Sequence, residues 1–419
     1  MKRLKVLVSA YACSPCQGSE PGMGWGWVNA MSQHHELWVI CSEKFRSETE
    51  NALDKNPELR DCIHFHYIPR KRFRLIEKLC PLSYYWTYRT WQQDACRLAA
   101  NLHSEICFDV AHQLNMVGFR EPGYLWKLPI PYVWGPIGGL ELTPWRFLSC
   151  MGTYGALYHG ARNITNLLQM NFLPRPRRAA DKADANIISA TDGIARLVRK
   201  LWHRNSKTIC EIGIDPQNVT FIPRTKIESE PIRIAWSGQH TPGKALNLLL
   251  GALRVLPKNV NWHLDVLGSG SMTKKWKLLA KRYGIDSQCK FHGWLSRENA
   301  LSVMSVANVF VITSLKDLTS TVLIEAISYG LPVICLDHCG MADVINQDCG
   351  IKIPVTTPKQ AMRDFSKAIE KLAKNPEELR RLSAGAFNRS KEYSWQLHSQ
   401  RMSEIYKNAI EHYHKNSMS

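Results

Sequence analysis

The stretch ANVFVITSLKDLTSTVLIEAISYGLPVICLD, residues 307–337, carries the pattern that decides the fold of this chain. Its first run of β-branched and aromatic residues predicts a buried strand, and the apolar spacing that follows predicts a helix. Ser320 or Thr321 is suited to cap this helix, Gly330 ends it, and a second apolar run predicts another strand. Strand, helix and strand in this order indicate a parallel βαβ unit.

The same alternation extends along most of the chain. We expect strands in LKVLVSAY, HELWVICS, IHFHYIP, FDVAHQL, PYVWGP, ANIISAT and VTFIPR, and then in IRIAWSG, WHLDVLG, CKFHGW, ANVFVITS, PVICLD and GIKIPV. Continuous apolar strands separated by helix-length segments indicate parallel sheets that are covered on both faces. The polar stretch 224–231 lacks periodicity and is the best linker candidate. We therefore predict an α/β chain with an N-terminal domain at 1–228, a C-terminal domain at 229–394 and a long helix at 395–419.

Length and composition agree with two globular domains that carry a cationic surface. The chain has 419 residues, of which 45% are hydrophobic, and 54 Lys and Arg against 36 Asp and Glu give a formal charge of +18. Such a charge suits an anionic substrate, an anionic membrane surface or nucleic acid. Nucleic acid is the weaker alternative, because the sequence contains no helix-turn-helix, RNP or zinc-finger pattern.

The cysteines and the N-terminal run bear on the cellular compartment. Thirteen cysteines are an odd number and are scattered mostly singly, which indicates free thiols in a reducing cytoplasm. The CxxC at Cys13 and Cys16 leaves a redox pair as a weaker alternative to a loop, and CLDHC at Cys335 leaves a metal site as a weaker alternative to a strand end. The apolar run near residue 5 is too short for an export signal, and no stretch approaches the roughly 18 apolar residues that span a bilayer. We expect a cytoplasmic protein.

Two carboxylates in the opening stretch need an explanation. Asp317 follows the predicted strand, and Glu325 lies one turn inside the predicted helix, with the hydroxyls of Thr319, Ser320 and Thr321 between them. A helix N-terminus with nearby hydroxyls suits phosphate, whereas carboxylates accept hydrogen bonds from vicinal hydroxyls on a sugar ring. The pattern therefore describes a diphosphate flanked by two polyols, as in a nucleotide-sugar. A solvated helix residue and an ordinary turn residue are the alternative.

This stretch resembles the E-x7-E signature of retaining GT-B glycosyltransferases of family 4, and EAISYGLPVI matches the segment that follows it. The resemblance implies two Rossmann-like domains that face each other across a cleft, with the closing helix crossing back to the first domain. It also implies that Asp317 contacts hydroxyls of the transferred sugar and that Glu325 contacts the ribose. Asp317 is one methylene shorter than the usual glutamate, so sugar identity or position is expected to differ.

The segment IAWSGQHTPGK resembles the diphosphate loop of that family. The resemblance implies that Lys244 neutralises the leaving diphosphate and that Gly238 belongs to the same donor site. Gln239 stands where the family has an arginine, and we expect a partly protonated His240, or Gln239 as a neutral donor, to compensate. In LGSGS, Gly268 predicts a tight turn near the nucleotide.

Motifs of the first half also match the family. GSEPGMGW resembles its glycine-rich first loop, which implies that Gly22 and Gly24 allow close approach to the donor phosphate. His112, at the end of a predicted strand, matches the active-site histidine, although a structural histidine is the alternative. The segment WGPIGG resembles that of a bacterial subgroup. The residues expected on the acceptor side are Glu20, Gly138, Gly139 and Glu141.

The resemblance implies a retaining hexosyltransferase of cell-surface polysaccharide or lipopolysaccharide synthesis. It would move a sugar from a nucleotide-sugar to a saccharide or a lipid-linked saccharide, with no cofactor and no metal, since no DxD motif lies in a cleft loop. Basic and aromatic residues at 69–91 suggest peripheral contact with the anionic inner face of the plasma membrane. Gln239 and Asp317 keep a non-catalytic nucleotide-sugar-binding relative open. The base, the sugar, the acceptor, the linkage and the oligomeric state are left open by the sequence.

Overall fold

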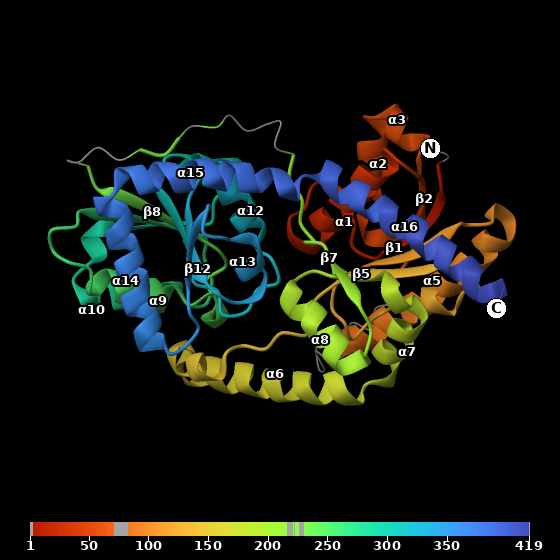
Figure 1. The fold of residues 1–419 in the computed structure, drawn as a ribbon, viewed down its shortest axis with the longest axis horizontal. Helices are drawn as coiled ribbons and strands as arrows, with labels where there is room; N and C mark the ends of the chain where they lie inside the picture. Colours follow the sequence, from red (N-terminus) through yellow and green to blue (C-terminus); the bar gives the residue numbers. More distant parts are fainter. Residues whose placement is uncertain (1–2, 71–82, 216–220, 222, 226–229, 419) are drawn as a thin grey trace. The chain divides into compact units, whose positions relative to one another are not determined.

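The computed structural model of the chain describes residues 3–70, 83–215, 221, 223–225 and 230–418. Its contacts group the chain into two compact units, each built on a parallel sheet (Figure 1). Unit 1 comprises Met1–Leu140, Leu168–Gly213 and Trp395–Ser419, and unit 2 comprises Glu141–Leu167 and Ile214–Ser394.

The sheet of unit 1 has seven strands in the order β3-β2-β1-β4-β5-β6-β7. Their bounds are β1 Lys5–Ala10, β2 Glu36–Ser42, β3 Ile63–Ile68, β4 Val110–Asn115, β5 Tyr132–Ile137, β6 Ile187–Ser189 and β7 Ser206–Thr208. Each neighbouring pair is parallel. Every residue of β4 and β5 is buried, as expected for central strands of a parallel sheet that is covered on both faces. In β4 this burial includes the polar side chains of His112, Gln113 and Asn115.

Helices cover the sheet of unit 1, and the C-terminal helix is one of them. They are α1 Ser19–Ser32, α2 Arg46–Asp54, α3 Pro57–Arg60, α5 Ser83–Ile106, α7 Pro174–Ala183, α8 Asp192–Trp202 and α16 Trp395–Met418, with short turns η1 Glu43–Phe45, η2 Leu125–Lys127 and η4 Asp184–Asn186. Helix α16 packs on α1, where the rings of Trp27 and Trp395 meet edge to face at 5.6 Å. Trp27 Nε1 also donates a hydrogen bond to Glu211 O at 2.9 Å. Packing of these large rings ties α16 to unit 1.

The sheet of unit 2 has six strands in the order β10-β9-β8-β11-β12-β13. Their bounds are β8 Ile232–Ser237, β9 Trp262–Leu267, β10 Cys289–Gly293, β11 Val309–Ile312, β12 Val333–Leu336 and β13 Gly350–Ile353. All neighbouring pairs are parallel. This strand order reverses beside β8, so the loops after β8 and β11 flank the point where ligands bind in open α/β sheets.

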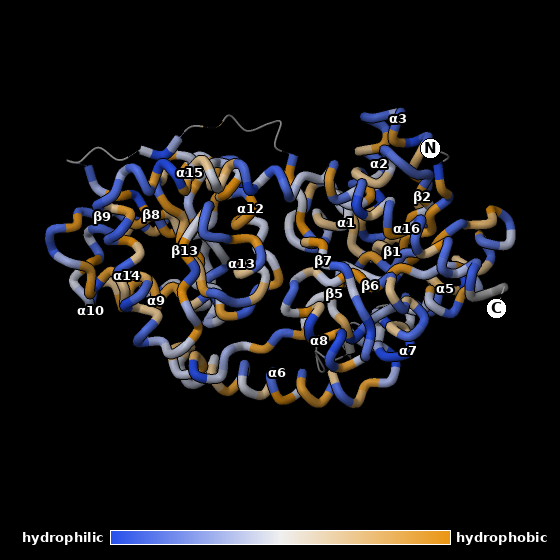
Figure 2. Tube along the Cα trace, viewed as in Figure 1, coloured by the Kyte–Doolittle hydropathy of each residue, from blue (hydrophilic) through white to orange (hydrophobic). Residues whose placement is uncertain are grey.

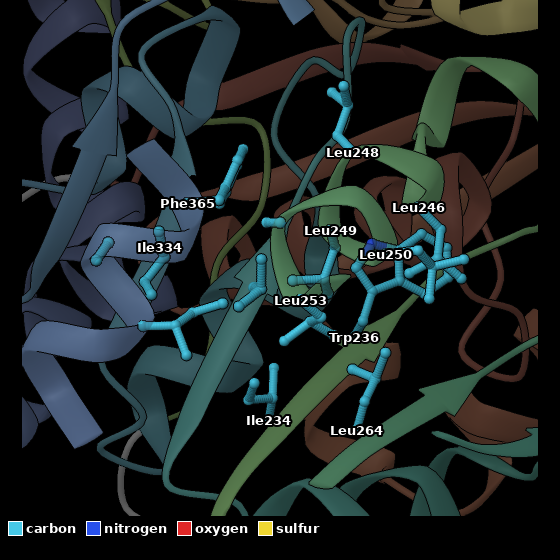
Figure 3. Packing of buried hydrophobic residues seen from close by; sticks show 14 of the residues in the cluster. Ile234, Trp236, Leu246, Leu248, Leu249, Leu250, Leu253, Leu264, Ile334 and Phe365 are labelled. Atoms are coloured by element: carbon cyan, nitrogen blue, oxygen red, sulfur yellow. The ribbon is translucent and has the colours of Figure 1, made fainter. Parts of the chain in front are cut away.

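Several helices of unit 2 contribute side chains to an apolar cluster. The helices of this unit are α6 Gly152–Phe172, α9 Leu246–Arg254, α10 Thr273–Tyr283, α11 Arg297–Ser305, α12 Thr321–Ser328, α13 Cys339–Val344, α14 Pro358–Lys374 and α15 Pro376–Ser390, with η3 Trp145–Met151, η6 Pro242–Lys244, η7 Asp286–Gln288 and η8 Lys391–Tyr393. Those that contribute to the cluster are α9, α10, α14 and α15. The boundary between the units divides α6 after Leu167. Figure 3 shows Trp236 of β8 among the leucines of α9, with Phe365 of α14 and Ile334 of β12 in the same cluster. These strands and helices are held together by burial of apolar side chains at about 25 cal/mol per Å².

The predicted strands are confirmed with small shifts at their ends, apart from VTFIPR, which lies largely outside the described residues. Strand β7 was not predicted, because SKT is a short polar edge strand without an apolar run. The contact grouping assigns 141–167 and 214–228 to unit 2, whereas the sequence-based domain ranges placed them in the first domain. In the ranges that the structure describes, no helix is both long enough and apolar enough to span a bilayer.

Candidate active site

Four loops of unit 2 leave neighbouring strands at one edge of the sheet. They follow β10, β9, β8 and β11, which are adjacent in the strand order. Parallel strands place their carboxyl ends on the same side. Most of the donor-side residues predicted from the sequence lie in these loops or at the helix N-terminus that follows the last one.

Lys244 and Asp317 form an ion pair between two of these loops. The Lys244 ammonium donates a hydrogen bond to Asp317 Oδ2, and the two side chains are 21% and 22% exposed. Backbone contacts hold the loops in register: Leu315 N donates to Gly243 O at 2.8 Å, and Thr313 Oγ1 donates to Lys244 O at 2.7 Å. Because its own backbone is anchored, Lys244 presents its charge from a defined position, as a group that stabilises a developing negative charge must.

His240 does not supply the charge that we expected of it. Its ring is fully buried, Nδ1 lies 2.8 Å from Thr273 Oγ1, and burial lowers the pKa of the imidazole below its usual value. The ring is therefore neutral near pH 7. The expectation that a partly protonated His240 replaces the missing arginine was wrong. Gln239 is exposed in the same loop and remains the candidate for a neutral donor.

Two glycines allow the loop after β9 to lie directly against the loop after β8. Gly268 has φ +107°, and a Cβ at this position would lie 2.1 Å from Gly238 O. A Cβ at Gly270 would lie 2.6 Å from His240 O. No other residue type fits such an approach without moving the backbone. The tight turn predicted at Gly268 is present, and its contact with Gly238 ties it to the predicted diphosphate loop.

The N-terminus of α12 carries the three predicted hydroxyl residues. Ser320 occupies the N-cap with extended backbone angles, but its side chain makes no capping hydrogen bond. Thr321 is exposed, and Thr319 is 5% exposed. Gly340 supports this segment: a Cβ there would lie 2.3 Å from Thr319 Oγ1, so α13 can approach only because residue 340 lacks a side chain. The sequence pattern located the N-cap but did not reveal the role of Gly340.

Glu325 lies one turn inside α12 and is paired with the arginine that begins α11. Its side chain is 13% exposed, and Arg297 Nε donates to Glu325 Oε1 at 2.7 Å. Burial raises the pKa of Glu325, and the hydrogen bond and charge of Arg297 oppose that rise. Arg297 itself is 72% exposed, so the pair can open toward another hydrogen-bond donor at little cost. Sequence reasoning missed Arg297, because only its position after β10 brings it to this sheet edge.

His112 lies in unit 1 at the centre of β4. The ring is fully buried, with Nε2 2.7 Å from Gly135 O and Nδ1 2.7 Å from Tyr406 Oη. A carbonyl can only accept, so Nε2 carries the proton and Nδ1 accepts from the tyrosine hydroxyl. Burial lowers the pKa of His112 to about 4. Both ring nitrogens are used within the protein, which favours the structural interpretation of this histidine over contact with a sugar.

The predicted first loop of unit 1 is mostly helix, because α1 begins at Ser19. A Cβ at Gly22 would lie 2.4 Å from Gln17 O, and one at Gly24 would lie 2.2 Å from Ala12 O. These glycines let α1 pack against the segment that precedes it, so their approach is to protein backbone. The segment that we expected to form a glycine-rich loop is helical from Ser19 onward.

The residues predicted for the acceptor side fall into both units. Glu20 Oε1 accepts a hydrogen bond from Val117 N at 2.7 Å, and burial raises the pKa of this carboxyl. Gly138 N donates to Val117 O at 2.6 Å, and Gly139 needs its φ of +84°. Glu20, Gly138 and Gly139 belong to unit 1, whereas Glu141 groups with unit 2.

The cysteine motifs carry no metal cluster in the part of the chain that the structure describes. Cys13 and Cys335 are buried free thiols, and Cys16 is an exposed one. Burial raises the pKa of the Cys13 and Cys335 thiols. No group of three or more His, Cys, Asp or Glu within the described ranges is placed to hold a metal ion.

Known proteins are similar to this chain in sequence and in fold. Residues 219–389 match the family model of the glycosyl transferases group 1. This segment, which is less than half of the chain, is similar to that family. A D-inositol 3-phosphate glycosyltransferase from Saccharomonospora viridis is 23% identical over 342 residues, which cover 74% of this chain and 76% of the relative. A putative colanic acid biosynthesis glycosyltransferase, WcaL, from Escherichia coli is 20% identical over 205 residues, which cover 47% and 50% of the two chains.

The architecture of the chain is the GT-B fold that the sequence predicted. The structure of Anabaena HepE in complex with UDP aligns with a TM-score of 0.60 at 14% identity and covers 97% of this chain and 100% of that chain. Two parallel-sheet α/β units account for the likeness. The matched family segment, 219–389, falls within the second part of unit 2, Ile214–Ser394, which holds Lys244, Asp317 and Glu325.

Proposed function

We propose that this protein is a glycosyltransferase, specifically a retaining, metal-independent hexosyltransferase that uses a nucleotide-sugar donor. The observation that carries the proposal is the Lys244–Asp317 ion pair, fixed beside the N-terminus of α12 in the family-matched segment. A cation, a helix N-terminus and two carboxylates provide separate partners for a diphosphate and for the hydroxylated rings on either side of it. The HepE structure, which holds UDP, supports such a donor.

In the proposed binding mode, the donor diphosphate replaces Asp317 as the ion-pair partner of Lys244. The freed Asp317 carboxylate then accepts hydrogen bonds from hydroxyls of the sugar. Glu325 accepts from the ribose hydroxyls in the same way, and its exposed partner Arg297 moves away. The exchange leaves no charge without a partner, because the diphosphate replaces Asp317 beside Lys244 and sugar hydroxyls replace Lys244 beside Asp317.

The proposed chemistry needs no protein nucleophile. The acceptor hydroxyl oxygen attacks the anomeric carbon on the face from which the diphosphate leaves, and the bond between that carbon and the phosphate oxygen breaks. The departing phosphate takes the proton of the acceptor hydroxyl. Lys244 stabilises the negative charge that develops on the leaving group, while Asp317 and Glu325 fix the donor. His112 has no part in this scheme, because both of its ring nitrogens are engaged within unit 1.

We place the acceptor among saccharides or lipid-linked saccharides of cell-surface polysaccharide synthesis, at the cytoplasmic face of the membrane. The segment 69–91, which suggested the membrane contact, lies partly outside the described residues, since 71–82 are not among them. Within its described part, Trp86 is 71% exposed and Trp91 is 1% exposed. The first tryptophan is available to a partner and the second belongs to the core.

The test is a panel of UDP-, GDP-, ADP- and dTDP-sugars incubated with the purified protein and candidate acceptors, with and without EDTA. We expect release of one nucleoside diphosphate, unaffected by EDTA, and a product that keeps the anomeric configuration of the donor. If the protein binds one donor in a thermal-shift assay but releases no nucleoside diphosphate, it is a non-catalytic nucleotide-sugar-binding relative. This is the alternative that the replacement of the usual arginine by Gln239 left open. An inverted product, or activity abolished by EDTA, would contradict the proposed chemistry.

A further inference from the structure

Helix α6 is arranged the opposite way from an ordinary surface helix. On its inner face, Asn163 is fully buried, accepts a hydrogen bond from Thr143 N at 3.0 Å and donates one to Thr143 O at 2.7 Å. His159, on the same face, is 9% exposed and lies 3.3 Å from Thr143 Oγ1. A helix on a protein surface normally turns its apolar side inward and its polar side to water.

The outer face of α6 carries large apolar side chains instead. We define it by Tyr154, Leu157, Tyr158, Ile164, Leu168 and Phe172, which are 79%, 75%, 51%, 55%, 55% and 78% exposed. Their spacing of mostly three or four residues places them along one side of a single helix. Figure 2 shows apolar residues recurring along α6. Single exposed apolar residues are common on proteins, whereas a continuous row marks an interaction surface.

The charges around this face select its partner. From Leu142 to Ala180 the sequence contains no Asp or Glu, and it contains Arg146, Arg162, Arg175, Arg177 and Arg178. Arg175 is paired with Glu121, while the other four are exposed. Trp145, which is 49% exposed, and the two tyrosines of the outer face combine an apolar ring with a polar tip, as side chains at a lipid–water interface do.

We propose that the outer face of α6 docks on an anionic lipid bilayer. Apolar and aromatic side chains enter the boundary between headgroups and acyl chains, and the flanking arginines bind lipid phosphates. A second copy of this chain is disfavoured as the occupant, because it brings the same cations and the same net charge of +18. This surface is distinct from the segment 69–91. The docking proposal rests on the proposed function in one respect: docking would bring the enzyme to a lipid-linked acceptor.

The test is flotation of the purified full chain with vesicles of phosphatidylcholine alone or mixed with phosphatidylglycerol. We expect the wild type to float with the mixed vesicles and to be released by salt. The variant L157S/I164S/F172S should lose most of this binding, and R146E/R162E should lose it several-fold. The matched control is V255S/L278S/V306S, which removes three apolar side chains of 56%, 58% and 57% exposure elsewhere in unit 2 and should float like the wild type.

Donor-dependent nucleotide release in solution should be the same in all these variants, which separates a failure of the docking proposal from a failure of the proposed function. Equal flotation of the wild type and L157S/I164S/F172S would overturn the proposal. So would absence of binding by the wild type to mixed vesicles. A dimer in sedimentation velocity that L157S/I164S/F172S dissociates would assign the face to a second copy instead.

Discussion

Lys244 and Asp317, 73 positions apart in the chain, are joined by a hydrogen-bonded ion pair within unit 2. Each residue comes from a loop at the carboxyl end of a strand, and β8 and β11 are neighbours in the sheet. The pair therefore links the predicted diphosphate loop to the acidic signature of the family. It also means that both groups of the proposed donor site are held in position by protein before they meet a ligand.

Replacement of Lys244 should abolish most of the transfer reaction without unfolding the protein. In Lys244→Ala the leaving diphosphate loses its cation, and we expect kcat/KM to fall by about 100-fold or more. The protein should still unfold cooperatively, with a melting temperature lowered by at most several degrees, because Asp317 keeps some contact with water. Lys275→Ala, which removes an exposed lysine of α10, is the matched control. Turnover near the wild-type rate in purified Lys244→Ala would refute the site assignment.

Glu325→Gln should weaken donor binding while keeping or improving stability at neutral pH. Burial raises the pKa of Glu325 above its ordinary value of 4.5, so the fold disfavours the charged carboxylate. The protonated carboxyl of Glu325 therefore contributes to stability. This contribution is fully present below pH 4.5 and is lost as the pH rises through the raised pKa. A neutral amide removes the penalty, and it accepts weaker hydrogen bonds from ribose, which we expect to weaken donor binding about tenfold.

Unfolding of the wild type and Glu325→Gln should therefore be followed at pH 4 and pH 7.5, together with donor titrations. Glu298→Gln, at an exposed position of α11, controls for the loss of one negative charge. We expect the difference in unfolding free energy, Glu325→Gln minus wild type, to be more favourable at pH 7.5 than at pH 4. The reverse order would contradict the burial argument. Unchanged donor affinity would remove Glu325 from the site.

Gly268→Ala should damage the donor loops far more than the same substitution at another glycine with positive φ. A Cβ at Gly268 would lie 2.1 Å from Gly238 O, so one of the two loops must move. At Gly284, φ is +67° and a Cβ would meet nothing within 4 Å, so Gly284→Ala costs only the backbone strain, about 1 kcal/mol. We expect Gly268→Ala to lower both unfolding free energy and donor affinity, as measured by denaturant titration and calorimetry. Equal effects of the two substitutions would argue against the close contact.

The stability of unit 1 should fall in mildly acidic solution because of His112. Burial lowers its pKa from 6.5 to about 4, so the stability that the neutral ring contributes is present above pH 6.5 and is lost as the pH falls toward 4. The shift corresponds to at most about 3 kcal/mol. Chemical unfolding across this range should show a steeper loss for the wild type than for His112→Gln. His112→Gln should still lose some stability as the pH falls, because burial also lowers the pKa of His35 to about 4. Parallel pH profiles for the two proteins would show that His112 does not titrate in this way.

The sequence by itself determined the α/β class, the two parallel sheets and the positions of Lys244, Asp317 and Glu325. These features are local: a buried strand is a continuous apolar run, a helix has a regular spacing, and the loop between them holds the polar residues. The tertiary structure decided which of those residues have partners. Arg297 reaches Glu325, Gly340 makes room for Thr319, and burial keeps His240 neutral. It also turned the apolar side of α6 outward. Such relationships depend on which strands become neighbours and on which side chains lose water, and no spacing along the chain encodes either one.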